Sequence, residues 1–134
     1  MNKILNDLKA IGGFFIFPIL VLIAHLILVF FFKIYLIFPK YDILMHFVGG
    51  ISIGYTSFLS LKYLQKRKYF TLNTFFRVLF VLALVSLTAL LWEFFEFLAS
   101  YITGMGLQGN LVDTMADLFF GLLGGLFIIL LLER

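Results

Sequence analysis

Four long apolar runs constrain this chain more than any other feature of its sequence. They cover about 11–32, 43–64, 72–101 and 111–132. Each reaches the roughly 20 residues that a helix needs to cross a hydrocarbon core of about 30 Å. Helices are the expected spanning elements, because lipid offers the backbone no hydrogen-bond partner and the runs lack the two-residue alternation of barrel strands. The sequence therefore predicts an all-α four-helix transmembrane bundle, with residues 1–134 forming a single integral-membrane domain.

Composition supports a membrane protein and excludes several functions. The chain is 63% hydrophobic and 13% charged, against roughly 25% charged residues in soluble domains. Its net charge of +3 comes from short basic patches beside apolar runs, which favours an anionic membrane surface over nucleic acid as a partner. The absence of cysteine excludes disulfides, thiolate metal sites and a cysteine nucleophile. We therefore expect membrane lipids, and no nucleic acid, as partners.

The first ten residues, MNKILNDLKA, have the pattern of a short interfacial helix. Ile4, Leu5 and Leu8 share one helical face, and polar side chains occupy the rest. A cleaved signal peptide is the less favoured alternative, because the apolar run that follows exceeds the roughly 7–15 residues of a signal core.

The basic residues predict the orientation of the bundle. With four spans, Lys33 and Lys40 flank one side of the membrane, and the other eight Lys and Arg residues lie on the opposite side. Cytoplasmic flanks carry the excess of Lys and Arg. We therefore expect a multi-pass protein of the inner (cytoplasmic) membrane, with both termini in the cytoplasm.

Polar residues occur in pairs near the expected outer ends of three spans. Within each pair the spacing is three or four residues, so both side chains project from one face of their helix. In the orientation above, all three pairs converge on the outer leaflet. Glycines continue the same faces of the second and fourth spans, where small residues allow close helix packing. The pairs are Asp42 with His46, Glu93 with Glu96, and Asp113 with Asp117.

A shared divalent metal ion is the simplest way to tolerate these carboxylates. Buried carboxylates cannot all stay charged without partners, and the nearby Lys33 and Lys40 are expected to reach toward headgroups. Carboxylates with one imidazole suit Mg²⁺, Mn²⁺, Fe²⁺ or Zn²⁺, and the paired pattern is typical of di-metal helical bundles. Whether one or two ions bind is left open. The expected metal ligands are Asp42, His46, Glu93, Asp113 and Asp117, with Glu96 as general base.

Structural explanations compete for some of these residues. Asp42 and Asp113 stand at helix starts, where an aspartate commonly caps the helix or complements its dipole. His25, in the middle of the first span without an acidic neighbour, is more typical of a packed histidine. Glu93 and Asp117 lie deeper, and carboxylates inside a membrane usually mark function or pair with one another.

Three segments, YDILMHFVGG, WEFFE and GLQGNLVDTMADLFFGLLGG, carry a family resemblance. In order and spacing they are similar to the YjdF-like family of small inner-membrane proteins, over roughly Tyr41 to Gly125. A more distant similarity is to VanZ-like proteins, which are associated with glycopeptide-antibiotic resistance. The chain departs at Asn110, where the YjdF-like pattern has Asp, and at Gly121, where the VanZ-like pattern often has Asn. The resemblance implies a four-helix core with a polar site and assigns no reaction.

Three functions remain open from the sequence. The first is a metal-dependent enzyme that acts on a lipid or lipid-linked headgroup, since no serine-nucleophile motif, phosphate loop or HExxH is present. The second is cation or proton binding or transport, for which four helices would have to form a homo-oligomer. The third is a structural envelope protein without catalysis.

Overall fold

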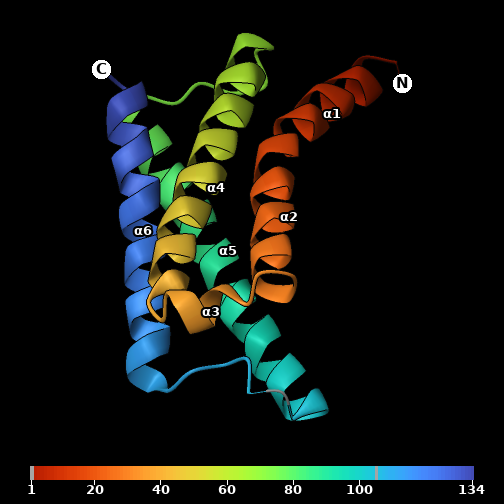
Figure 1. Cartoon of the computed structure of the whole chain (residues 1–134). Coiled ribbons are helices and arrows are strands. Elements are labelled where there is room, and N and C mark those ends of the chain that lie inside the picture. Colours follow the sequence, from red (N-terminus) through yellow and green to blue (C-terminus); the bar gives the residue numbers. More distant parts are fainter. Residues whose placement is uncertain (1, 105) are drawn as a thin grey trace.

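The computed structural model describes residues 2–104 and 106–134, which form helices joined by loops (Figure 1). No strand occurs in this described part of the chain, so the all-α prediction is confirmed. The helices are α1 (Asn2–Phe14), α2 (Ile16–Phe30), α3 (Ile34–Ile37), α4 (Tyr41–Lys66), α5 (Thr74–Thr103) and α6 (Leu111–Leu132).

Four helical stretches are long and apolar enough to cross a membrane, as the sequence predicts. They are Lys3–Phe30, Tyr41–Lys66, Thr74–Thr103 and Leu111–Leu132. The last has the expected bounds, and the middle two differ from expectation by two residues at each end. The first differs more, because the run expected to be continuous over 11–32 is divided between α1 and α2.

Pro18 explains where the first stretch bends. Proline has no N–H, so the carbonyl of Phe14, four residues earlier, receives no bond from the helix. At the bend the Phe15 amide donates to the Gly12 carbonyl at 3.1 Å, which is a tighter turn than an α-helix. The free Phe14 carbonyl accepts the hydroxyl of the buried Thr56 at 3.1 Å. This bond joins the end of α1 to α4 and satisfies a carbonyl that lipid would leave unpaired.

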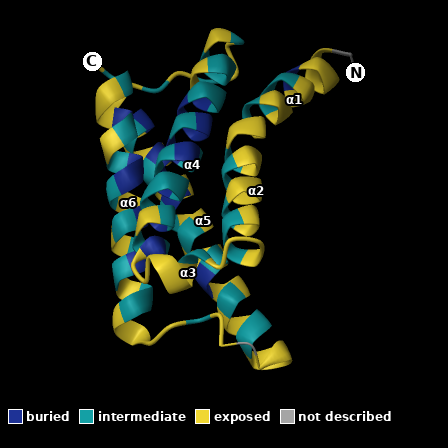
Figure 2. Cartoon of the chain, viewed as in Figure 1, coloured by how far each residue is buried: buried dark blue, intermediate teal, exposed yellow. Residues whose placement is uncertain are grey.

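Helices α4, α5 and α6 form the core of the bundle. Buried side chains gather along their shared faces, and exposed ones dominate α1 and α2 (Figure 2). Among the described residues, α2 packs against α4 but makes no close backbone approach to α5 or α6. A space therefore remains between α2 and α5. The buried apolar side chains at the centre of the core are Phe58, Leu61, Val81, Val85 and Ile129.

Glycines set the close approach of α4 to α6. A Cβ atom at Gly50 would lie 2.8 Å from the Gly121 carbonyl carbon and 3.1 Å from the Gly125 nitrogen. A Cβ at Gly124 would collide with the carbonyl of Phe47. The close packing expected from the small residues is therefore present, and Gly124 contributes to it although the sequence pattern did not single it out.

Both termini lie at the same end of the bundle, together with the α4–α5 connection (Figure 1). Here Glu133 binds Arg77 through two contacts, one of them a 2.6 Å bond from Nη2. Nearby, the buried Asp7 accepts hydrogen bonds from the hydroxyls of Tyr63 at 2.7 Å and Tyr69 at 2.6 Å. Asp7 thus fixes α1 to the bundle. Which side of the membrane this end faces stays a prediction.

The exposed face of α1 agrees with the interfacial helix expected from the sequence. Ile4, Leu5 and Leu8 each expose half or more of their surface, whereas Asp7 exposes 3%. One side of α1 is therefore held by polar bonds, and its apolar side is free to contact the membrane.

Candidate metal centre

His46 lies at the centre of the polar cluster, between helices α4, α5 and α6. It sits one turn after Asp42 in α4, and only 9% of its surface is exposed. Its Nε2 atom is 3.6 Å from Oε1 of Glu93 in α5, a separation too long for a hydrogen bond. Two groups of side chains share His46. Within each group, one potential metal-ligating atom per residue lies within 4.8 Å of the others. The groups are Asp42, His46 and Asp117, and His46, Glu93 and Glu96.

The structure thus brings together five of the six residues that the sequence singled out. Helical spacing aims both members of the α4 pair, and of the α5 pair, toward the same side. Small residues next to the cluster let α4 and α6 approach closely, since a Cβ at Gly121 would lie 3.7 Å from the His46 carbonyl. The close contact of α4 with α6 places Asp117 opposite His46.

Three polar atoms of this cluster are buried without a hydrogen-bond partner. They are Nε2 of His46, Oε1 of Glu93 and Oδ1 of Asp117. Glu93 exposes 4% of its surface and Asp117 exposes 2%, so water has little access to either. Buried polar groups are nearly always paired, and an unpaired group calls for an explanation such as a bound ion or water. His46 belongs to both groups, so a cation beside it would lie near Asp117 in one group or near Glu93 in the other.

Two neighbouring carboxylates are each held by one aromatic donor. The Tyr35 hydroxyl donates to Oδ1 of Asp42 at 3.0 Å, and the Trp92 indole donates to Oε1 of Glu96 at 2.9 Å. Burial, followed by the nearby Asp42 charge, raises the pKa of Tyr35, so it remains a donor. Tyr35 could not be singled out from the sequence, because it lies in the short α3 between two spans and shares no helical face with the predicted pairs.

Asp113 stands outside both groups. Its carboxylate lies against Gly109 in the loop before α6. The cap of α6 is Asn110, whose side chain accepts from the amides of Val112 at 2.9 Å and Asp113 at 3.2 Å. Asp113 therefore lies in the first turn of α6, where its charge complements the helix dipole.

His25 of α2 lies beside the cluster, although the sequence alone suggested a packed histidine. Its ring stacks on Tyr41 at 5.7 Å between centroids and meets the edge of Trp92 at 6.2 Å. Its Nδ1 atom is buried and has no hydrogen-bond partner. His25 is therefore packed against aromatic rings and also carries a buried polar atom without a hydrogen-bond partner.

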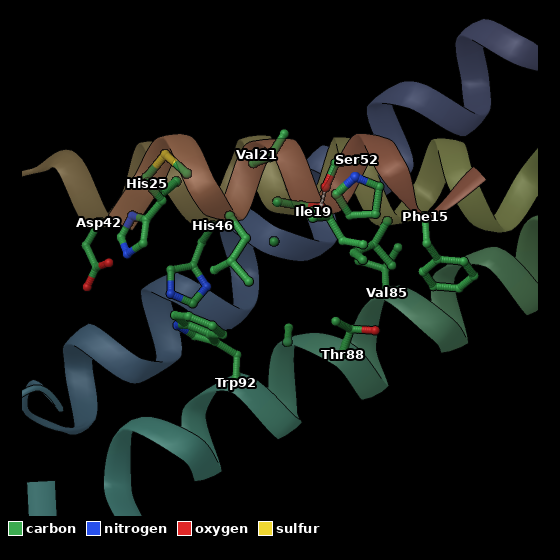
Figure 3. A pocket seen from close by; sticks show the side chains of 18 residues that line it. Phe15, Ile19, Val21, His25, Asp42, His46, Ser52, Val85, Thr88 and Trp92 are labelled. Atoms are coloured by element: carbon green, nitrogen blue, oxygen red, sulfur yellow. Dashed lines mark hydrogen bonds between the residues drawn. The ribbon is translucent and has the colours of Figure 1, made fainter. Parts of the chain in front are cut away.

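A pocket of about 270 Å³ opens from this cluster along the space between α2 and α5. Figure 3 shows His25, Asp42, His46 and Trp92 at one end, with Phe15 and Val85 toward the other. The pocket results from the separation of α2 and α5, which no local pattern in the sequence predicts.

Comparison with known proteins identifies a family. The model of the family DUF2238, described as predicted membrane protein, matches residues 8–134 of the chain. Neither the curated proteins nor the solved structures provide a match.

Proposed function

We propose that this chain, which belongs to the DUF2238 family of predicted membrane proteins, is a metal-dependent enzyme embedded in the membrane. Its substrate would be a lipid or a lipid-linked headgroup, reached from the leaflet that contains the carboxylates. The enzyme would belong to the inner membrane, with the centre on the outer side, as the excess of basic residues at the opposite end favours.

The observation that carries this proposal is the set of unpaired buried atoms on three helices. His46 Nε2, Glu93 Oε1 and Asp117 Oδ1 have no hydrogen-bond partner, and each belongs to a group whose donors lie within 4.8 Å of one another. A carboxylate that is buried without a partner is strongly unfavourable. A divalent cation beside His46, the residue that the two groups share, would supply the missing positive charge.

The residues have distinct roles in the proposal. Asp42, His46, Glu93 and Asp117 would hold the ion, whose ligand set of carboxylate oxygens and one imidazole suits Mg²⁺, Mn²⁺, Fe²⁺ or Zn²⁺. The ion would polarise a phosphoryl or ester oxygen of the substrate. Asp113 is left out of the ligand set, because its carboxylate lies against Gly109.

Glu96 would act as the general base. Trp92 occupies its Oε1 atom through a 2.9 Å hydrogen bond, which fixes the orientation of the carboxylate. The second oxygen is then free to accept a proton from an attacking water molecule.

Metal analysis of the purified protein tests this proposal. We expect a stoichiometric divalent metal in the wild type, and less than about a tenth of it in Glu93→Gln and Asp117→Asn. Substituting a residue that only hydrogen-bonds to a metal ligand already lowers metal affinity about 10–100-fold, and these two substitutions change the ligands themselves. Asp113→Asn is the matched control, since it removes an equal charge one turn away and should retain the metal. A metal-free wild type of normal stability would overturn the proposal and favour a purely structural cluster.

Transport has less support from the fold. Between the cluster and the opposite end lie the fully buried Val81, Val85 and Ile129. The hydroxyls of Ser52 and Thr56 at this depth both donate to backbone carbonyls. Proton or cation flux through liposomes that contain the wild type, lost in Glu93→Gln, would favour transport over the enzyme.

A further inference from the structure

The pocket beside the metal centre has two chemically different ends. At one end, His25 Nδ1 and His46 Nε2 are buried polar atoms without hydrogen-bond partners. Toward the other end, the hydroxyl of Ser52 donates to the Gly49 carbonyl and that of Thr88 donates to the Leu84 carbonyl, each at 2.8 Å. The hydroxyls of the second end are thus satisfied within their own helices. An occupant that matches the pocket has a polar head and an apolar chain (Figure 3).

The length of the pocket corresponds to one leaflet. Along α2 and its N-cap the lining runs from Phe15 to His25, and along α4 from Asp42 to Ile53. Ten or eleven residues of helix rise by about 15–17 Å, which is about half of a hydrocarbon core of about 30 Å. The polar end lies at the level of the carboxylates, so the apolar end reaches toward the middle of the bilayer.

Gly49 borders the open space of the pocket. It lines the pocket, and a Cβ atom built on it would meet nothing within 4 Å. The adjacent Gly50 differs, because a Cβ there would meet the backbone of α6. Helix packing therefore explains the glycine at position 50 but not the one at position 49, which borders empty space.

We propose that this pocket binds one hydrocarbon chain of a membrane phospholipid and thereby positions its phosphate against His46 and Asp42. The identity of the head rests on the proposed function, because a phosphate is the group that a metal at His46 would bind. The assignment of a hydrocarbon chain to the pocket depends only on the shape and apolar lining of the pocket. The pocket opens between α2 and α5, whose outer faces carry exposed apolar side chains, so a lipid could enter sideways from its own leaflet.

Trp92 offers a direct test, because it is the single tryptophan of the chain and lines the pocket. The probe is lysophosphatidic acid with bromine atoms on the acyl carbons nearest its headgroup, which would lie beside Trp92 at the polar end, added to protein in unbrominated detergent. Bromine quenches tryptophan on contact, so we expect saturable quenching in the wild type. Absence of saturable quenching would overturn the proposal.

Gly49→Leu should weaken this quenching, since the new side chain begins in the space that the lipid chain would fill. Each displaced methylene is worth about a fourfold factor in binding, so the apparent affinity should fall at least about tenfold. Gly12→Leu is the matched control, because Gly12 also has nothing within 4 Å but lies in α1, outside the pocket lining. Equal quenching in Gly49→Leu and the wild type would contradict the proposal.

Thr88→Phe provides a second obstruction if Gly49→Leu fails to fold, with Thr88→Val as its control. Thr88 lines the pocket, and its hydroxyl bonds only to its own helix. A brominated alcohol of the same chain length tests the head: binding as tight as that of the phosphate would overturn the assigned headgroup.

Repeating the titration in a chelator separates this inference from the proposed function. Saturable quenching that survives chelation and is weakened in Gly49→Leu supports binding of the hydrocarbon chain in the pocket, even where metal analysis finds no metal. Bound metal in a wild type that shows no quenching supports the metal centre and overturns the chain pocket.

Discussion

Gly49 and Gly50 are neighbours in α4 but have opposite surroundings, which makes them a matched pair. We expect Gly50→Ala to destabilise the protein by about 1–3 kcal/mol, because its Cβ would press on the backbone of Gly121 and Gly125. Gly49→Ala should leave stability unchanged or raise it by up to about 1 kcal/mol, since alanine favours the helix and meets no atoms. Thermal unfolding in detergent measures both. Similar losses in the two variants would contradict this assignment.

Several residues of the centre could be predicted because helical spacing alone determines which side chains share a face. Asp42 with His46 and Glu93 with Glu96 are of this kind, and each pair meets at the cluster. Asp113 has the same spacing from Asp117 but lies against the preceding loop. Residue spacing determines which face of a helix a side chain occupies. It does not determine how the preceding loop covers the first turn of α6, so the contact of Asp113 with Gly109 could not be predicted from the sequence.

At the scale of the helices, the bend between α1 and α2 depends on a bond between distant residues. Thr56→Val should cost about 1 kcal/mol, because the Phe14 carbonyl loses its hydroxyl donor inside the membrane. In a Pro18→Ala background the same substitution should cost close to nothing, since residue 18 then supplies the missing N–H. A double-mutant cycle of thermal stabilities measures this coupling. An equal cost in both backgrounds would mean that the bond to Thr56 does not compensate for the proline.

The four spans were predictable because length and continuous hydrophobicity are properties of each segment by itself. The division of the first run was not, although Pro18 is visible in the sequence. A proline in a membrane helix is tolerated in many ways, and the choice of a bend here involves Thr56, which lies 42 residues away. The pocket between α2 and α5 is a consequence of the same tertiary arrangement.

At the scale of the whole molecule, charge is separated between the two ends of the bundle. One end holds the carboxylates of the candidate centre, and the other holds the partly buried pair of Arg77 and Glu133 together with the hydrogen bonds of Asp7. Between them lies the apolar core. The sequence predicted this polarity through the distribution of basic residues, but it did not predict that Asp7 and Glu133 would be anchored by specific partners.

The Arg77–Glu133 pair joins the first turn of α5 to the end of α6, so its charge state should affect the stability of the entire bundle. The bonds from Arg77, and then its charge, lower the pKa of Glu133 below its ordinary value. A group whose pKa is lower in the folded state stabilises the fold at pH values above its unfolded pKa, and this contribution is lost as the pH falls through the folded pKa. Near pH 7, Glu133→Gln should therefore cost about 2 kcal/mol, the usual value for a hydrogen bond to a charged group.

The pH dependence of that cost separates the ion pair from simple packing. The difference between wild type and Glu133→Gln should begin to shrink below the unfolded glutamate pKa of about 4.3. It should be lost once the pH has fallen through the lower folded pKa, where the wild-type carboxyl is neutral like the amide. Thermal unfolding of both proteins between neutral and acidic pH measures this difference, and the other carboxylates titrate in both and largely cancel. A difference that stays constant with pH would show that Glu133 acts through shape alone. A difference that vanishes in acid would show that its charge holds α5 and α6 together at the end opposite the candidate centre.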